Sequence, residues 1–283
     1  FAQVVAEAHR RGMRVILDGV FNHCGSFNKW LDREKIYAGR AGYAPGAYLD
    51  PESPYRDFFK FSNENGWPDN GSYEGWWDHN TLPKLNYEGS EVLYQYVLDI
   101  AKKWLSPPYN IDGWRLDVAD ELPMDFLRAL RTAAKRARRD ALVLGEVWED
   151  ASNKITYGQM RNYCLGDTLD SVMNYPLREA ILDFVTGKHD APALVRLINH
   201  QAEVYPAPFR YALMNLIGSH DRARTLNVLC GRDGVGLSKK EQKELRLTEK
   251  EYALAVARYK LCVDILCALP GSPTIYYGDE AGL

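Results

Sequence analysis

The sequence predicts an α/β protein with parallel strands, of the (β/α)8 TIM barrel class, and three observations carry that prediction. Short apolar runs that suit buried strands alternate with helical patterns along the 283 residues, as in parallel sheets. Polar residues follow four of the predicted strands at their C-terminal ends (His23, Asp117, Glu146 and Asp221), where such barrels gather their chemistry. A doubly wound sheet also binds ligands at this end, but the glycine-rich phosphate turn common in that fold is missing from the sequence.

The chain begins with a predicted helix over residues 1–11, followed by Gly12 in the position of a C-cap glycine. The nearly continuous apolar run of residues 13–20 then predicts a strand buried on both faces. A second helix is expected after Ser90, a good N-cap, because an apolar stripe with helical spacing reaches Trp104.

The later elements alternate in the same way. In chain order we expect a strand near 115, a helix after 123, a strand over 141–148, a strand over 168–174, helices over 176–186 and 191–204, a strand over 211–217, a helix over 249–269 and a strand over 273–278. This gives six strands, two fewer than a closed barrel of this class contains.

Residues 24–88 show no clear period and are rich in Gly, Pro, Asn and Asp. A structureless loop of this length is improbable inside a compact domain. We therefore expect a small inserted domain or folded lid that leaves the barrel after a strand and overhangs the cleft. Its aromatic residues can form its own core, which we favour for Trp30 and Phe58, or can offer platforms to sugars, for which Trp76 and Trp77 are the candidates.

Composition narrows the range of functions. A hydrophobic fraction of 46% and a charged fraction of 26% are ordinary for a globular protein with a real core. The formal charge of −3 gives no reason to expect nucleic acid or an anionic membrane as partner, and no apolar run approaches the roughly 20 residues of a membrane span. The five scattered cysteines indicate neither a zinc site nor a disulfide framework. Free thiols favour a cytoplasmic location, although the chain starts without Met and a lost signal peptide leaves secretion open.

The stretch around residues 111–120 is the strongest candidate for chemistry. Side chains alternate on a strand, so Arg115 and Asp117 share one face at the strand's C-terminal end. A guanidinium beside a carboxylate lowers its pKa and keeps it ionised, as a nucleophile at a sugar's anomeric carbon requires. A purely structural Arg–Asp pair explains this stretch equally well. Glu146 is a second candidate, because it ends an apolar strand face where a carboxylate is unusual unless functional or paired.

Several motifs resemble those of the α-amylase family of glycoside hydrolases (family 13), in the order in which that family carries them. They are Asp18-Gly19-Val20-Phe21-Asn22-His23, Gly113-Trp114-Arg115-Leu116-Asp117, Gly145-Glu146-Val147-Trp148 and Ser219-His220-Asp221. Leu82-Pro83-Lys84-Leu85-Asn86 resembles a motif of the branch that contains neopullulanase, cyclomaltodextrinase and maltogenic amylase. Gly278-Asp279-Glu280 resembles the turn after the family's last barrel strand. The resemblance extends over nearly the whole chain.

The resemblance implies a role for each matching residue. Asp117 is the expected nucleophile, Glu146 the general acid/base and Asp221 the carboxylate that binds and distorts the sugar next to the scissile bond. His23, Arg115 and His220 are expected ligands of that sugar. The further substrate-binding candidates are Arg224, Trp148, Trp76 and Trp77.

These roles predict a retaining glycoside hydrolase that works by double displacement. It would cleave α-glucosidic bonds, mainly α-1,4 and also α-1,6, in maltodextrins, cyclodextrins, pullulan or starch. For this, Arg115 should hold Asp117 ionised, while burial and neighbouring carboxylates should raise the pKa of Glu146. The alternatives are a predominantly transglycosylating enzyme and a non-catalytic glycan-binding or partner module of the same fold. The presence of all three carboxylates favours an active enzyme.

The resemblance also bears on completeness, cofactors and partners. The family's first two strands and its C-terminal β domain have no counterpart here, so residues 1–283 read as a fragment of about strands 3 to 8, with the insert after the third strand. No cofactor is required. Asn22 resembles a calcium ligand of many amylases, but this branch often lacks the site and no calcium-loop pattern supports it. The expected partner is an α-glucan, and the full-length protein is a candidate homodimer.

Overall fold

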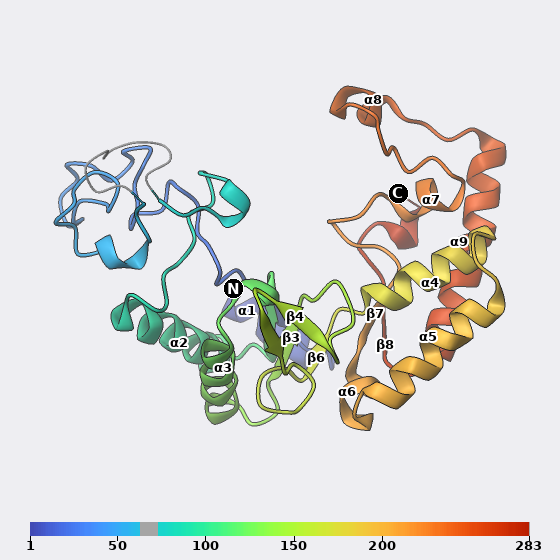
Figure 1. Cartoon of the computed structure of the whole chain (residues 1–283), viewed down its shortest axis with the longest axis horizontal. Helices are drawn as coiled ribbons and strands as arrows, with labels where there is room; N and C mark the ends of the chain where they lie inside the picture. Colours follow the sequence, from blue (N-terminus) through green and yellow to red (C-terminus); the bar gives the residue numbers. More distant parts are fainter. Residues whose placement is uncertain (63–72, 283) are drawn as a thin grey trace. The chain divides into compact units, whose positions relative to one another are not determined.

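The structure is a computed structural model that describes residues 1–62 and 73–282. The chain divides into two compact units, Phe1–Glu146 and Val147–Leu283, and Figure 1 shows their elements. Each unit alternates strands with helices, as the sequence predicts. Among the described residues, no helix is both long enough and apolar enough to span a membrane.

The first unit is built on three parallel strands, with β1 paired to β2 and β2 to β3. Asp18 stands opposite Arg115 in the register of the β1–β2 ladder. Helices α2 and α3 lie between the strands in sequence, and Ser90 caps α2 by accepting a hydrogen bond from the Leu93 N–H. The unit's helices and strands are α1 (Ala2–Arg10), β1 (Ile16–Gly19), α2 (Glu91–Leu105), β2 (Gly113–Leu116), η3 (Ala119–Glu121), α3 (Met124–Ala137) and β3 (Leu142–Gly145).

The expected helix end at Gly12 is confirmed. Gly12 has φ +73°, its N–H donates to the His9 carbonyl and the N–H of Met13 donates to the Ala8 carbonyl, a Schellman ending. The expectation that the first strand is buried on both faces is wrong for the described residues. Ile16 is 36% exposed, and Asp18 on the same strand face is exposed as well.

The described parts of the insert, 24–62 and 73–88, contain two short 3-10 helices, η1 (Arg56–Phe58) and η2 (Trp76–Asp78), and isolated single-residue β-bridges. Trp30 packs edge-on against Phe58, which is 6% exposed, as expected for residues of the insert's own core. Residues 63–72 lie outside the described part of the chain, and a separate domain over 24–88 stays a prediction.

The second unit pairs β7 with β8 in parallel, and Met173, just after β6, bridges to Met214 in β7. Its apolar core lies between α4, α5, α7 and α9. The elements are β4 (Lys154–Thr156), β5 (Gln159–Arg161), β6 (Ser171–Val172), α4 (Tyr175–Thr186), α5 (Ala191–Val204), α6 (Ala207–Ala212), β7 (Met214–Leu216), α7 (Thr225–Leu229), α8 (Lys239–Glu244), α9 (Glu249–Ala268), β8 (Ser272–Thr274) and η4 (Asp279–Ala281).

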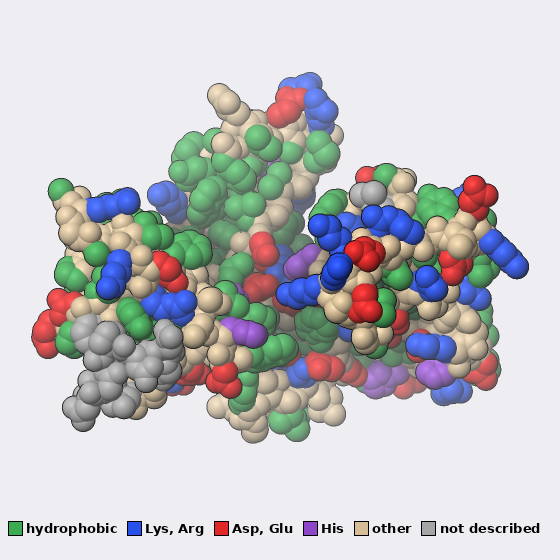
Figure 2. Space-filling view, turned by 90° about the horizontal axis from the view of Figure 1, so that it is seen from above, with side chains coloured by type: hydrophobic (Ala, Val, Ile, Leu, Met, Phe, Trp, Pro, Cys, Tyr) green, Lys and Arg blue, Asp and Glu red, His purple; other side chains and the backbone are tan. Residues whose placement is uncertain are grey.

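All six predicted strands are present, although most are shorter than expected. The strand expected over 211–217 begins only at Met214, because Tyr211 and Ala212 are the last residues of helix α6. The antiparallel hairpin of β4 and β5 was not expected. On the face seen in Figure 2, basic and acidic side chains are interspersed among hydrophobic ones, in keeping with the small net charge.

Candidate active site

The centre of the candidate site in the first unit is the guanidinium of Arg115, on strand β2. Its Nη1 donates to Asp18 Oδ1 at 2.8 Å and to Asp117 Oδ1 at 2.7 Å. Its Nη2 lies 2.9 Å from Glu146 Oε2, an ion pair whose angles are not those of a hydrogen bond. The structure therefore brings two of the predicted catalytic carboxylates, Asp117 and Glu146, to one cation.

Glu146 is fixed from two sides. It is 4% exposed, and besides the Arg115 contact its Oε2 accepts a hydrogen bond from the Val118 N–H at 2.8 Å. Val118 has φ 40° and ψ 56°, a left-handed conformation that is a genuine outlier for a β-branched residue. Such strain persists only where the surroundings enforce it, and it clusters at functional sites. The turn after Asp117 thus aims a backbone donor at the predicted acid/base.

The electrostatics around Arg115 keep it charged. Burial lowers the pKa of the guanidinium, but the hydrogen bond to Asp18, the charge of Glu146 and the hydrogen bond to Asp117 outweigh burial and raise it. The expected raised pKa of Glu146 stays a prediction.

His23 lies just beyond strand β1 and is 9% exposed. Its Nδ1 is 3.3 Å from the side-chain nitrogen of Asn22, and His23 forms an antiparallel bridge with Lys84 of the insert. Burial lowers the pKa of His23, while the negative charge of Asp117 acts in the opposite direction. The imidazole is therefore biased toward its neutral form, which can both donate and accept hydrogen bonds.

Trp76 and Trp77 lie on η2 of the insert and join the same site. Trp76 stacks on the His23 ring, with centroids 5.0 Å apart and planes at 2°. Trp77 stacks on Trp76 at 5.1 Å and is 71% exposed.

The second unit holds Asp221, His220 and Arg224, on the segment after β7. The backbone N–H of Asp221 donates to Ser219 Oγ at 3.3 Å. The side-chain oxygen Oδ2 of Asp221 lies 3.2 Å from His220 Nε2. Arg224 donates to the Tyr277 carbonyl at 3.3 Å. Asp221 and His220 remain partly exposed, at 31% and 58% of their side chains, as residues that contact a substrate require.

Trp148, two residues after Glu146, stacks on Tyr175 with centroids 4.6 Å apart. The guanidinium of Arg222 lies 4.4 Å from the Trp148 ring and 5.5 Å from the Tyr175 ring. A cation on the far face of Trp148 would be roughly 9 Å from Tyr175, so these distances place Arg222 beside the stack.

Sequence reasoning assigned no role to Asp18, Val118, Tyr175 or Arg222. Asp18 interrupts an apolar run, the same signal that identified Glu146, and could have been found. Val118 contributes through its backbone N–H, which every residue other than proline carries. Nothing in its side chain indicates that role.

Asn22, which resembles a calcium ligand of many amylases, is 2% exposed, and its side-chain nitrogen faces His23. Calcium prefers six to eight oxygen ligands with several carboxylates. In residues 1–62 and 73–282, no group of three or more His, Cys, Asp or Glu side chains is arranged to hold a metal. That no metal or cofactor is required stays a prediction.

Parallel strands with carboxylates and an arginine at their C-terminal ends define a barrel-type α/β enzyme site. Residues 1–283 match the family model described as "Alpha amylase, catalytic domain". The chain therefore belongs to the α-amylase family, which confirms the resemblance seen in its motifs. The predicted fold class is confirmed as well.

Curated relatives and solved structures agree with this assignment. The chain is 36% identical over 312 residues to an amylopullulanase of Thermoanaerobacter thermohydrosulfuricus, covering 100% of this chain and 20% of the relative. It is 34% identical over 287 residues to a cyclomaltodextrinase of Thermoanaerobacter pseudethanolicus, covering 99% and 42%. It is similar to the cyclic alpha-maltosyl-(1→6)-maltose hydrolase of Arthrobacter globiformis, with TM-score 0.76, 30% identity and coverage of 100% and 54%. The chain thus spans between a fifth and about half of these proteins.

Proposed function

We propose that this chain carries the catalytic residues of a retaining α-glucan hydrolase. The observation that carries the proposal is the contact of one guanidinium, that of Arg115, with both Asp117 and Glu146. Retaining glycosidases use two carboxyl groups separated by only about 5–5.5 Å. A shared cation holds two carboxylates at short range without leaving their repulsion uncompensated.

The chemistry assigned to these residues is a double displacement. Asp117 attacks the anomeric carbon while Glu146 protonates the departing glycosidic oxygen, and the C–O bond to the leaving sugar breaks. Water then attacks the glycosyl-enzyme, with Glu146 taking its proton and Asp117 leaving.

Asp221 takes the third role, accepting hydrogen bonds from sugar hydroxyls that tighten in the transition state. His23, His220 and Arg224 are proposed to bind the same sugar. Trp148 is proposed as an aromatic contact for a neighbouring one, because aromatic faces suit the apolar faces of sugar rings.

The proposed substrates are maltodextrins, cyclodextrins, pullulan and starch, cleaved mainly at α-1,4 and also at α-1,6 bonds. The relatives' names support this range, since they include a cyclomaltodextrinase, amylopullulanases and a neopullulanase. Cytoplasmic location and dimerisation of the complete protein remain part of the proposal.

The test uses the complete natural protein with maltotriose, pullulan and cyclodextrin in separate reactions. Proton NMR of the first-formed reducing ends should show the α-anomer before mutarotation, because two inversions give retention. Chromatography of the products assigns the linkage cut and separates hydrolysis from transfer. The β-anomer appearing first would exclude double displacement, and tight glucan binding without any product would favour the non-catalytic module.

A further inference from the structure

Three rings from two distant segments form a continuous stack in the first unit. His23 and Trp76 are parallel within 2° with centroids 5.0 Å apart, and Trp76 and Trp77 stack at 5.1 Å and 28°. Among the described residues, no ring contact joins His23 directly to Trp77, so Trp76 links the two rings. Trp76 is half-buried, whereas Trp77 is 71% exposed.

The backbone of the insert is strained to make this stack. Trp77 has φ 47° and the next residue, Asp78, has φ 59°, both left-handed and unfavourable for residues with a Cβ. Neighbouring side chains on an extended chain point apart, and this turn brings two adjacent indoles together. A Cβ on Gly75 would lie 2.4 Å from the His79 carbonyl oxygen, so the turn requires glycine there.

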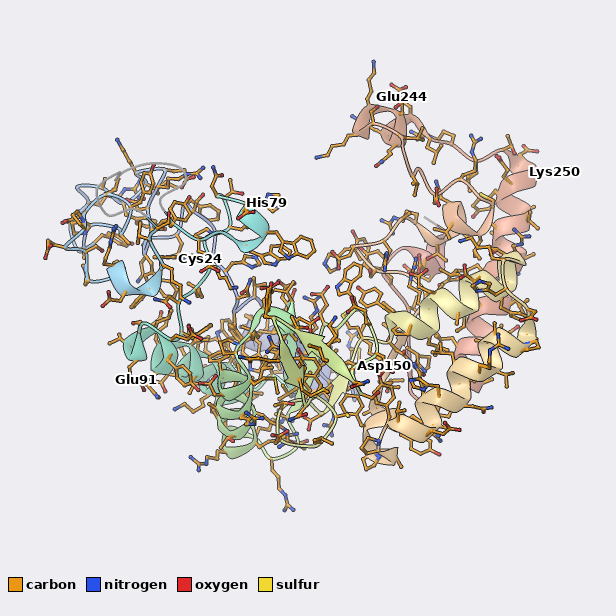
Figure 3. The ribbon with its side chains drawn as sticks, in the orientation of Figure 1. Cys24, His79, Glu91, Asp150, Glu244 and Lys250 are labelled. Carbon is orange, nitrogen blue, oxygen red and sulfur yellow. The ribbon has the colours of Figure 1, made fainter. Side chains whose placement is uncertain are left out.

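The turn is also anchored at its base. The N–H of Trp76 donates to the Leu82 carbonyl at 2.9 Å, and Gly75 bridges to Pro83. Figure 3 labels Cys24, the residue after His23, and His79, two residues after Trp77. Cys24, next to His23, donates its backbone N–H to the Pro83 carbonyl at 3.1 Å. The segments that carry the rings are therefore held to each other by backbone hydrogen bonds.

Stacking holds the Trp76 indole in place. Its Nε1 is buried and finds no hydrogen-bond partner among the residues that the structure describes. A buried indole normally satisfies this donor, so the side chain is placed for its ring contacts. One of the rings that it stacks on is that of His23.

We propose that Trp76 is a positioning residue that fixes the His23 imidazole, and that of the two neighbouring tryptophans only Trp77 presents a sugar platform. This inference rests on the glucan-hydrolase function proposed above. The sequence suggested both Trp76 and Trp77 as sugar platforms. The inference keeps that role for Trp77 and gives Trp76 a positioning role. A sugar can stack on the exposed Trp77, while Trp76 acts on the substrate only through His23.

The charges around His23 make the proposal measurable. Burial lowers the pKa of His23 although the Asp117 charge opposes this, and Trp76 supplies a ring that stacks on the imidazole. Lys84 bridges to His23 through its backbone, while its ammonium pairs with Glu74 and Glu121. Removing Trp76 admits water to His23 and leaves the Asp117 charge in place. The pKa of His23 should therefore rise.

The experiment compares Trp76→Ala, Trp76→Phe and Trp77→Ala in the complete protein. NMR follows the His23 titration, assigned with His23→Gln, and kinetics compare a long maltodextrin with a short aryl α-glucoside. Trp76→Ala should raise the His23 pKa and lower kcat on both substrates, on the order of 10- to 100-fold, because misplacement near the chemistry is costly. Trp76→Phe keeps a stacking ring. It should therefore restore most of kcat and bring the His23 pKa back toward its original value.

Trp77→Ala is the matched control. It should leave the His23 titration unchanged and raise KM for the maltodextrin roughly three- to tenfold, more than for the aryl glucoside, as loss of one aromatic contact predicts. Should Trp76→Ala fail to fold, Trp76→Leu keeps apolar cover without a ring and takes its place.

The outcomes separate the two proposals. An unchanged His23 titration in Trp76→Ala, with KM raised only for the maltodextrin, would make Trp76 a platform and overturn the inference. If Trp76→Ala shifts the His23 titration but the unsubstituted protein cleaves neither substrate, the positioning role of Trp76 is supported. The proposed hydrolase function is then contradicted.

Discussion

Replacing Arg115 with methionine removes the guanidinium that contacts Asp18, Asp117 and Glu146. The three side chains differ in exposure, at 52%, 18% and 4%. Deleting one partner of a buried ion pair costs about 3–5 kcal/mol, because the remaining charge is buried and unpaired. The exposed Asp18 pair contributes at most about 1 kcal/mol. We therefore expect Arg115→Met to lower the free energy of unfolding by about 3–5 kcal/mol, nearly all of it from Asp117 and Glu146.

Urea unfolding at neutral pH, followed by tryptophan fluorescence, measures this loss. In a double-mutant cycle, adding Glu146→Gln to Arg115→Met should recover part of it, because a neutral amide no longer needs the cation. Adding Asp18→Asn to the same background should recover much less and is the matched control. The reasoning is refuted if Arg115→Met costs under about 1 kcal/mol, or if the Glu146 effects are additive to within about 0.5 kcal/mol.

Two further predictions follow from named contacts. Asp117→Asn should keep the fold, as judged by circular dichroism, and lower kcat by at least ~10³-fold, about 4 kcal/mol of activation free energy; a near-normal kcat would remove Asp117 from the nucleophile role. Burial raises the pKa of Asp112, but hydrogen bonds from Val15 and His9 and the Arg138 charge outweigh it and lower the pKa. The stability gained is present above about pH 4 and disappears as pH falls through the folded value. Asp112→Asn should therefore be destabilising in urea at pH ~7 and nearly neutral at very low pH, and a pH-independent difference would contradict this.

The sequence predicted those parts of the fold and site that depend on side-chain pattern. The strand period of two placed Arg115 and Asp117 on one face, and they are hydrogen-bonded at 2.7 Å. An apolar run ending in a carboxylate identified Glu146, which shares the Arg115 guanidinium. The placements are seen in these contacts because burial restricts which residue types a strand tolerates, whereas the catalytic roles stay predictions.

Elements that depend on backbone conformation were missed. The β4–β5 hairpin turns at Tyr157 and Gly158, with φ 53° and 72°. Two consecutive left-handed residues make a tight hairpin turn, for which Asn-Gly or Asp-Gly is the usual signal. Tyrosine in the first position gives no such indication. Helix α6 (Ala207–Ala212) is too short for its periodicity to stand out from the strand expected beside it.

Val118 shows why the missed features include part of the site itself. Its left-handed conformation should relax, since it is unfavourable for a branched side chain. Three hydrogen bonds prevent this, because the Glu146 N–H donates to the Leu116 carbonyl at 2.9 Å, the Ala119 N–H to the Glu146 carbonyl at 3.2 Å, and the Val118 N–H to Glu146 Oε2 at 2.8 Å. The bonds join the ends of β2 and β3, so the residue after Asp117 is held in register with Glu146. The strain therefore belongs to the pairing of two strands, and no single stretch of sequence contains it.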